Sequence, residues 1–573
     1  MPGDFSFRAA LTGALLGAVL SICNIYSGLK IGWSSNMSIT GALLAYAVWQ
    51  LRPASARAAR PFSILDTNLA QTAASSGAAV SSAGLVAGIP ALTILTGHVM
   101  PWPQLAAWVL SVCVLGIAVA IPIRRQMLII DPLPFPYGVA TAETLKQMYA
   151  KGADAMIRVR AMLLAGALGA AARILEHLKV TRSLPLLGSI GGVSLKSLTF
   201  ALDPSVLLVA VGGLMGLRGG VSLMAGAILA YGVLAPWLLG AGIVAPGAPD
   251  KAWFKELVGW LLWPGVTLMV TSSLTTFALS WRALGQAFRG LGGGGTSEPG
   301  DIPTGWFVRL FAVALVLSVG LQMGLFGIPI WIAILGVLLS FALAIVGARV
   351  QGETGLTPVG AMGKVTQLVV GVAIPGDVSA NLMTANVTGG SASQCSDLMN
   401  DLKTGIVLGS TPKSQLVSQL FGAVGGSLLG SAVYLVLVPR PREQLFTPEW
   451  PAPAVATWKA VAEVFKVGVS ALPQKTLLAI AIAAVVGVAL ALLEGAAPKR
   501  HKRWIPSPSA LGLGFVVPAN QSLSMLIGGV LAALVARRWP AWHGRFWIVL
   551  CAGAVAGESL SGVGVSLSQM FGG

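Results

Sequence analysis

Charged residues are scarce in this chain. They account for 10% of its 573 residues, whereas a soluble domain carries roughly 25%, and apolar side chains account for 55%. A chain of this length with so few charges could not cover its surface in water, so lipid must be its main solvent. The sequence therefore predicts an integral membrane protein, whose organisation is counted in membrane spans rather than in soluble domains.

Histidine and cysteine are also rare, with four of each. The histidines form no HxxxH or HExxH pair and predict no metal site. A membrane enzyme needs a clustered nucleophile and base or a metal set, which such a composition disfavours. We therefore expect no catalytic residue, no metal site, no cofactor and no enzymatic activity. The cysteines are far apart and predict buried thiols rather than disulfides: Cys23, Cys113, Cys395 and Cys551.

Acidic residues are outnumbered by basic ones, 20 against 37, which gives a net charge of +17. The basic residues gather in short loops at 52–60, 124–125, 282–289 and 499–503. This distribution is the positive-inside pattern, with anionic lipid as the partner, and it does not indicate nucleic-acid binding. It predicts a multi-pass protein of the inner (plasma) membrane with both termini in the cytoplasm.

About sixteen stretches are long and apolar enough to suggest a membrane span, for which ~20 residues suffice. Since open strands cannot exist in lipid, we expect an all-α integral membrane fold. Tryptophans near the span ends, Trp108 among them, predict an interfacial belt. The predicted spans lie near 8–27, 37–51, 69–97, 104–122, 160–178, 204–217, 220–243, 257–281, 305–325, 328–349, 357–375, 379–396, 413–437, 475–493, 521–537 and 545–569.

A polar, glycine-rich linker divides the spans into two sets. It predicts an N-terminal membrane repeat at 1–290, a flexible cytoplasmic linker at 291–304 and a C-terminal membrane repeat at 305–573. About eight spans per repeat is an even number, so the two pseudo-repeats would be parallel, with substrate bound at their interface. Three pairs of short matches recur in the same order: 143–146 with 400–403, 166–169 with 422–425, and 222–226 with 524–528.

Four stretches are too polar and too rich in glycine and proline for a passive lipid-facing helix: 24–33, 131–146, 352–367 and 381–403. A helix that Pro358 interrupts would expose backbone groups to a substrate, so we expect some helices to be discontinuous. The stretch from Asn386 to Gln394 has almost no bulky residue, so it either packs closely against a neighbour or unwinds to line a cavity.

Motifs in these four stretches resemble the oligopeptide transporter (OPT) family. They are Gly-Leu-Lys-Ile-Gly-Trp at 28–33, Ala-Thr-Ala-Glu at 140–143, Gly-Glu-Thr at 352–354, and Ala-Asn-Val-Thr-Gly-Gly at 385–390 followed by Asp-Leu-Lys at 401–403. The resemblance covers about residues 8 to 570. The chain is similar in particular to a prokaryotic branch of the family, which is related to the yellow-stripe-like metal-chelate transporters.

The resemblance implies a secondary active transporter, a proton-coupled importer of short oligopeptides. An Asn-Pro-Gly signature of the eukaryotic peptide branch is missing, so import of metal–chelator complexes, siderophore-like or nicotianamine-like, stays open as the alternative. A channel is disfavoured because the spans are asymmetric and no filter motif is present. The partners that we expect are the small solute, protons and membrane lipid, and a homodimer stays open as the assembly.

Ionisable side chains within a membrane face protein or water, which makes them candidates for function. A zwitterionic substrate needs one group for its amine and another for its carboxylate. Each candidate also has a structural interpretation: helix capping, a solvated ion pair, or a hydrogen bond between helices. The proton-coupling candidates are Glu353, Glu143, Asp401 and Glu558, and the substrate-binding candidates are Asn24, Tyr26, Lys30, Asn381, Asn386 and Gln394.

Overall fold

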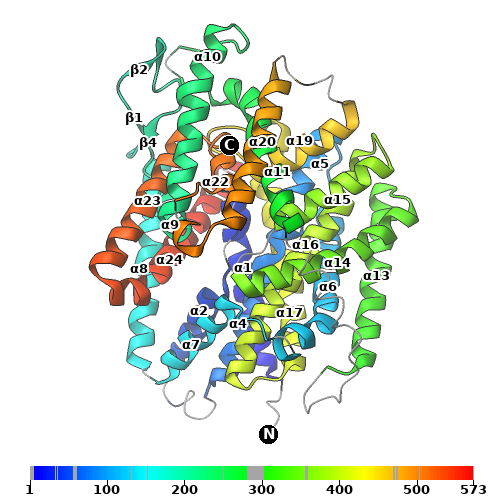
Figure 1. Cartoon of the computed structure of the whole chain (residues 1–573). Coiled ribbons are helices and arrows are strands. Elements are labelled where there is room, and N and C mark those ends of the chain that lie inside the picture. The colour runs from blue at the N-terminus through cyan, green and yellow to red at the C-terminus, as the bar shows by residue number, and fades with distance from the viewer. Residues whose placement is uncertain are drawn as a thin grey trace. The chain divides into compact units, whose positions relative to one another are not determined.

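The structure is a computed structural model. It describes residues 5–32, 34, 36–53, 55, 61–130, 132–150, 152–249, 251–279, 302–354, 359–468, 472, 475–502 and 504–571. Most of the predicted linker at 291–304, and the predicted break at Pro358, lie outside the described residues. The described chain is predominantly helical (Figure 1) and divides into two compact units, which are treated separately below.

Unit 1 comprises residues 1–25, 33–159 and 280–439. Its helical elements, of which α1 and α8 continue into unit 2, are α1 (Phe7–Ile31), α2 (Ser38–Gln50), α4 (Ile64–Ala79), η1 (Val80–Ala83), α5 (Gly88–Thr96), α6 (Trp102–Arg125), η2 (Gln126–Ile130), α7 (Pro136–Ala150), α8 (Gly152–His177), α13 (Thr304–Phe326), α14 (Ile330–Thr354), α15 (Val359–Ala373), α16 (Val378–Leu408) and α17 (Pro412–Leu437).

The centre of unit 1 is the long helix α16, which packs against α4, α5, α6, α7, α14, α15 and α17. Its start is fixed by Asp377, whose side chain accepts the backbone N–H of Ala380, and its end by Gly409 in the left-handed conformation. Of its 31 residues, 25 are buried. The stretch from Asn386 to Gln394 is helical throughout, so close packing, rather than unwinding, accounts for its small residues.

Unit 2 comprises residues 26–32, 160–279 and 440–573. Its further elements are β1 (Leu184–Pro185), β2 (Ser189–Ile190), β3 (Val193–Ser194), β4 (Ala201–Leu202), α9 (Val206–Ala227), η3 (Ile228–Leu234), α10 (Ala235–Gly240), α11 (Phe254–Leu279), α18 (Pro441–Gln444), α19 (Pro453–Val467), α20 (Thr476–Ala496), α21 (Lys499–Lys502), α22 (Pro508–Leu513), α23 (Ala519–Arg538) and α24 (Pro540–Phe571).

The all-α fold is confirmed, and four short strands occur beside the helices in unit 2. Each is two residues long, and they form two antiparallel pairs, β1 with β4 and β2 with β3. The segment between α8 and α9 contains proline and paired glycines and no apolar run long enough to span a membrane. It therefore forms short turns in which strands can pair locally.

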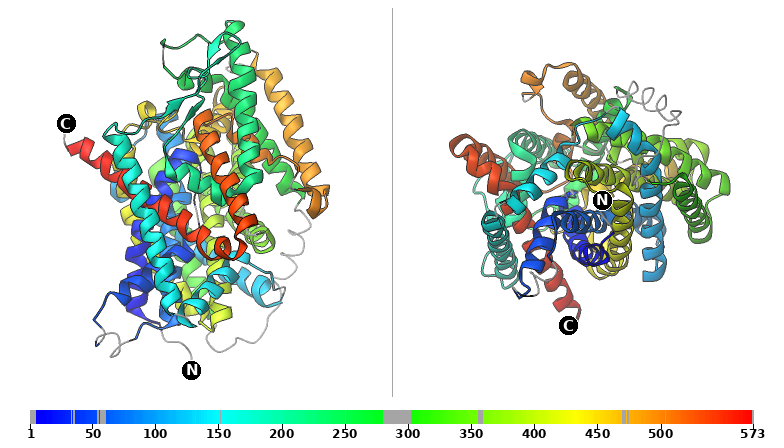
Figure 2. Two further views of the ribbon diagram at one scale, coloured as in Figure 1. Left: turned by 90° about the vertical axis from the view of Figure 1, so that its left-hand side faces the viewer. Right: turned by 90° about the horizontal axis from the view of Figure 1, so that it is seen from below.

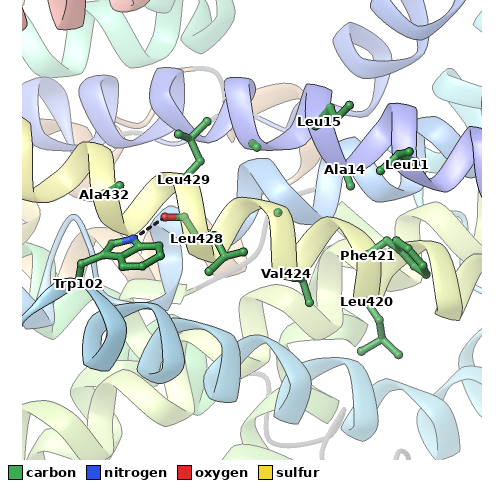
Figure 3. Close-up of a pocket in the computed structure, with 12 residues that line it drawn as sticks. Leu11, Ala14, Leu15, Trp102, Leu420, Phe421, Val424, Leu428, Leu429 and Ala432 are labelled. Atoms are coloured by element: carbon green, nitrogen blue, oxygen red, sulfur yellow. Dashed lines mark hydrogen bonds between the residues drawn. The ribbon is translucent and has the colours of Figure 1, made fainter.

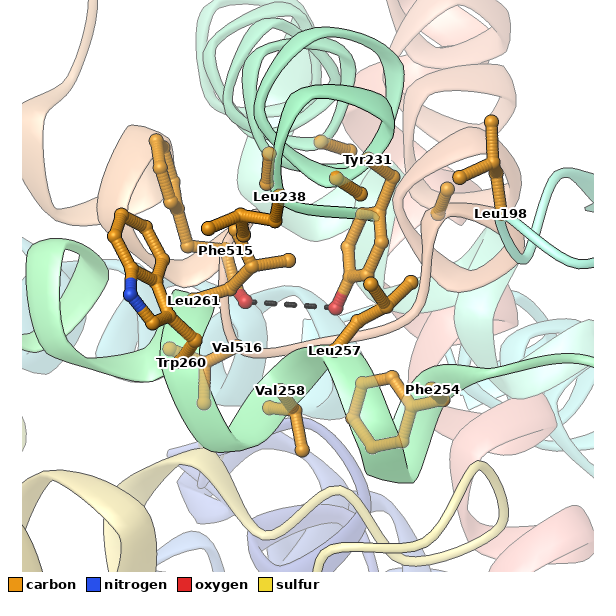
Figure 4. Packing of buried hydrophobic residues seen from close by; sticks show 14 of the residues in the cluster. Leu198, Tyr231, Leu238, Phe254, Leu257, Val258, Trp260, Leu261, Phe515 and Val516 are labelled. Carbon is orange, nitrogen blue, oxygen red and sulfur yellow. Dashed lines mark hydrogen bonds between the residues drawn. The ribbon is translucent and has the colours of Figure 1, made fainter. Parts of the chain in front are cut away.

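The hydrophobic core of unit 2 gathers around η3 and α11 (Figure 4). Tyr231 of η3 and Phe254 of α11 are completely buried and pack with Phe515, which follows α22. The Tyr231 hydroxyl donates a hydrogen bond of 3.4 Å to the carbonyl oxygen of Phe515. The aromatic side chains thus fix the short helix α22 against α11 and α9.

Eleven helical stretches among the described residues are long and apolar enough to cross a membrane, which makes the chain a multi-pass membrane protein. The predicted spans 204–217 and 220–243 fall in one such stretch, in which Gly216 breaks the helical geometry at φ 80° and ψ 173°. The predicted spans near 37–51, 160–178, 357–375 and 379–396 correspond to α2, α8, α15 and α16, which are helices but are too short or too polar for the same criterion. The count of sixteen stays a prediction.

Glycines set the closest helix crossings. A Cβ at Gly422 of α17 would overlap the carbonyl oxygen of Ala73 in α4. A Cβ at Gly557 of α24 would overlap the carbonyl oxygen of Gly166 in α8, which α24, drawn in red, crosses in Figure 2. Small residues are the usual means by which helices approach each other in lipid, where apolar burial gives no preference for protein over lipid.

We expect Gly422→Ala to lower the thermal stability of the detergent-solubilised protein, because the added methyl group forces α17 away from α4. Overpacking typically costs about 1–3 kcal/mol, while alanine returns up to about 1 kcal/mol of helix propensity. The control is Gly320→Ala in α13, where no atom lies within 4 Å of the new methyl. A Gly422→Ala protein as stable as the control would contradict the assigned crossing.

Candidate functional site

A cluster of polar side chains lies inside unit 1, where α2, α4, α16 and α17 meet. We call it the α16 polar cluster. Gln394 donates to the hydroxyl of Ser76 at 2.8 Å, and Ser76 donates to the carbonyl oxygen of Gln419 at 2.8 Å. Gln415 donates to the backbone carbonyl of Asp401 at 2.6 Å. The cluster comprises Asn36, Ser38, Asn68, Gln71, Thr72, Ser75, Ser76, Gln394, Asp397, Asn400, Asp401, Gln415, Ser418 and Gln419.

Two carboxyl groups stand one helical turn apart in this cluster, on the same face of α16. Asp401 is fully buried, and its Oδ1 accepts the Ser38 hydroxyl at 3.1 Å. Asp397 is hydrogen-bonded to the side chain of Asn36, and it keeps part of its surface accessible although protein surrounds it. Within the described part of the chain neither carboxyl forms an ion pair, so burial of their charge is not compensated by a cation.

Several atoms of the cluster have no hydrogen-bond partner among the described residues. Those that are buried in this way are Asp401 Oδ2, Gln415 Oε1, Gln394 Oε1 and both side-chain polar atoms of Asn400 and Gln419. An unsatisfied buried polar atom costs about 1–3 kcal/mol, so native proteins satisfy nearly all such atoms with protein or water. A concentration of them in one place indicates a site for water, an ion or a polar solute.

The contributions of α4 and α17 to this cluster were not predicted from the sequence. Asn68, Gln71, Thr72 and Ser75 recur at helical spacing along α4, as Gln415 and Ser418 do along α17. The signal was present, because a polar stripe with a period of 3.6 residues inside an apolar helix indicates a buried polar contact. Asp397 was missed too, although it lies four residues before Asp401.

A second part of α16 joins other helices. Asn386 accepts a hydrogen bond of 2.8 Å from the indole N–H of Trp108 in α6. Asn381 donates to the backbone carbonyl of Gln367 in α15 at 2.7 Å. The prediction of an interfacial position for Trp108 is wrong, because its side chain is completely buried and packs edge-on against Phe326 at 4.9 Å. A buried indole needs an acceptor, which Asn386 supplies.

Three of the predicted residues, Tyr26, Lys30 and Glu558, gather in unit 2. Lys30 lies in the last turn of α1, and its Nζ is 3.9 Å from Glu558 Oε1 of α24. Tyr26 lies one turn earlier, with the ammonium group 5.7 Å from its ring centre. Glu558 accepts the Ser205 hydroxyl at 2.6 Å and the Leu207 N–H at 2.7 Å, at the N-terminus of α9. Residues more than 500 positions apart thus form one buried ionic site.

Comparison with known proteins decides the family. The profile described as "OPT oligopeptide transporter protein" matches residues 4–569. The chain belongs to the OPT family. As a member of a transporter family it is not an enzyme.

Three relatives match this OPT chain over most of their length. A Saccharomyces cerevisiae protein provisionally named an oligopeptide transporter is 25% identical, covering 98% of this chain and 95% of the relative. A Haemophilus influenzae protein with the same provisional name is 25% identical, covering 94% and 91%. A metal-nicotianamine transporter of Arabidopsis thaliana is 22% identical, covering 97% and 90%.

Three further candidate residues of this OPT protein lie outside the two buried sites, as Asn381 and Asn386 do. Glu353, a proton-coupling candidate, has a side chain 47% exposed and pairs with Arg349 one turn earlier at 3.0 Å. Glu143 is likewise exposed and pairs with Lys146 at 3.4 Å, which is its structural interpretation. Asn24 is buried and donates to the carbonyl oxygen of Ala78 at 3.0 Å, which joins α1 to α4.

An apolar groove of about 680 Å³ lies along α1, α6 and α17 in unit 1 (Figure 3). Its walls are side chains such as Leu15, Phe421 and Leu429. The one indole N–H in it, from Trp102, is taken by the carbonyl oxygen of Leu428 at 2.9 Å. The groove thus offers contacts for lipid tails, and the polar chemistry of the OPT protein lies in the two buried sites instead.

We expect Trp108→Phe to destabilise the OPT protein by about 1–3 kcal/mol, because Asn386 loses its donor while it stays buried. Thermal unfolding followed by size-exclusion chromatography in detergent measures the effect. The matched control is Trp102→Phe, which also removes an indole hydrogen bond, but from a side chain that is exposed. Equal losses in both variants would show that burial of the Trp108–Asn386 bond adds nothing.

Proposed function

We propose that this OPT protein is a proton-coupled importer of short oligopeptides. The observation that carries the proposal is the α16 polar cluster, a set of buried amides, hydroxyls and carboxyls in the centre of unit 1. Each polar group within a membrane costs free energy and is retained where it serves a pathway for ions or solutes. Apolar and small residues are sufficient for lipid contact and for helix packing. Neither role therefore explains why the cluster contains carboxyls and unpartnered amides.

We place proton coupling at Asp401, with Asp397 beside it. A buried carboxyl without a cationic partner is stable when it is neutral, and it releases its proton when water or a charged solute reaches it. Two such groups one turn apart disfavour simultaneous ionisation, which favours the binding of one proton. Glu558 is a second buried acid, whereas the exposed positions of Glu143 and Glu353 favour their structural interpretations.

The second candidate substrate is a metal–chelator complex. The names of the Arabidopsis relative and of several rice relatives specify metal-nicotianamine transport. Peptides and such chelators share carboxylates and amines, so the same buried polar groups suit both. For the substrate-binding side chains we propose Asn24, Tyr26, Lys30, Asn381, Asn386 and Gln394.

The proposed topology has about sixteen helices in two parallel repeats, at 1–290 and 305–573, with both termini in the cytoplasm and the protein in the inner (plasma) membrane. The distribution of basic loops supports this orientation. The two compact units do not coincide with these halves, since each unit draws on both.

Uptake into proteoliposomes tests the proposed function. With an acidic exterior we expect saturable accumulation of labelled trialanine, and a gradient of one pH unit supports about tenfold accumulation at one proton per peptide. Nickel–nicotianamine in place of the peptide tests the second candidate. If collapse of the pH gradient leaves the uptake of both solutes unchanged, the proposed proton coupling is contradicted.

We expect Asp401→Asn to abolish proton-driven accumulation while it preserves exchange of internal for external solute. The amide keeps the size of the side chain but cannot carry the proton, so the accumulation ratio should fall from about tenfold to about one. The control is Glu143→Gln, an exposed acid on α7, which should accumulate solute as the wild type does. Normal accumulation by Asp401→Asn would place coupling elsewhere.

A further inference from the structure

The ammonium group of Lys30 is buried with an incomplete set of partners. Its side chain is 7% exposed, and its contact with Glu558 at 3.9 Å exceeds hydrogen-bond distance. Both oxygens of Glu558 already accept short bonds from Ser205 and Leu207. Among the described residues none provides Lys30 Nζ with a hydrogen-bond acceptor. A buried ammonium group has three donors to satisfy, and an unsatisfied charged donor is costly.

Other donors without partners lie around Lys30 in unit 2. The hydroxyl of Tyr26, one turn back along α1, has no hydrogen bond to a described residue. Arg173 of α8 interacts electrostatically with Tyr26, and its Nε is buried with no hydrogen-bond partner in the part of the chain that the structure describes. A Cβ at Gly562 of α24 would overlap the Tyr26 hydroxyl, so this glycine leaves the space in which the hydroxyl stands.

The acidic residues near Lys30 already accept hydrogen bonds from other groups. Glu176 and Glu449 accept hydrogen bonds from the two terminal nitrogens of Arg173, at 2.7 and 2.8 Å. Asp203 accepts the side chain of Asn520 at 2.9 Å and the N–H of Ser205 at 3.0 Å. These carboxylates are held by other residues, and among the described residues Glu558 is the acid that lies within 4.0 Å of Lys30 Nζ. The unpartnered atoms described above are donors, and Lys30 and Arg173 carry positive charge.

The end of α1 that carries Lys30 is held in place by contacts with the segment before α19. Trp450 packs edge-on against Tyr26 at 5.2 Å, and Ala452 donates its N–H to the carbonyl oxygen of Leu29 at 3.0 Å. Gly32, in the left-handed conformation at φ 71°, ends the helix directly after Lys30 and Ile31. A cation in the last turn of a helix is favourable by itself, but this effect does not explain the free donors of Tyr26 and Arg173.

We propose that Lys30, Tyr26 and Arg173 form a binding site for the carboxylate of the transported solute. A carboxylate has two oxygens that accept several hydrogen bonds, which matches the donors present. The inference rests on the proposed function, since it assigns the anionic end of a peptide or chelate to unit 2. Glu558 then positions Lys30 and neutralises it between transport events.

The test compares trialanine with trialanine amide, which lacks the carboxylate, by calorimetric titration of the full-length protein in detergent. We expect the wild type to bind trialanine about 10-fold tighter than trialanine amide, because the carboxylate forms charge-assisted hydrogen bonds that the amide cannot form. Lys30→Met should bring the ratio to about one, and Tyr26→Phe should lower it about 3-fold. Lys30→Arg, which keeps the charge, should restore part of it, and Lys146→Met, an exposed lysine, should leave it unchanged.

The ratio, rather than the affinity alone, separates recognition from stability, because a purely structural lysine would weaken both ligands equally. A wild type that binds acid and amide equally, or neither at millimolar concentration, would overturn the proposal, as would a Lys30→Met protein that keeps the ratio. If Lys30→Met does not fold, Tyr26→Phe and Lys30→Arg carry the test. Uptake is measured separately, so a ratio that depends on Lys30 without any uptake would reject only the transport function.

Discussion

The constraint on which this structure depends is the cost of placing polar groups inside a membrane. Helix α16 brings amides, hydroxyls and two carboxyls into the centre of unit 1, where the surrounding helices must satisfy them. The polar stripe of α4 and the glutamines of α17 face it, and glycines let these helices approach. The packing of unit 1 is thus arranged around a helix that carries these polar groups among buried apolar residues.

The two buried sites balance charge in opposite ways. In unit 1 the carboxyls of Asp397 and Asp401 stand among neutral groups, so a proton neutralises them most readily. In unit 2 the ammonium group of Lys30 and the carboxylate of Glu558 neutralise each other at a distance that leaves donors free. The proposed proton site therefore lies in unit 1, and the proposed carboxylate site lies among the free donors of unit 2.

Family membership and site chemistry answer different questions. The match over nearly the whole chain establishes an OPT transporter, while the relatives' names extend from oligopeptides to metal-nicotianamine. Both kinds of solute carry carboxylates and amines, so the proposed recognition of these shared groups suits either kind. Discrimination between them must come from the shape of the solute-binding space beyond the charged ends.

The sequence by itself determined the membrane class, the helical fold and the approximate bounds of most helices, because hydropathy and caps are local properties. It also indicated Asp401, Lys30 and Glu558, since a charge in an apolar run is visible without a structure. Only the tertiary structure decided which of these meet. It paired Lys30 with Glu558, exposed Glu353 and Glu143, buried Trp108, and revealed Asp397 and the amides of α4 and α17 as neighbours of Asp401. These outcomes depend on contacts between helices distant in sequence, which no local pattern specifies.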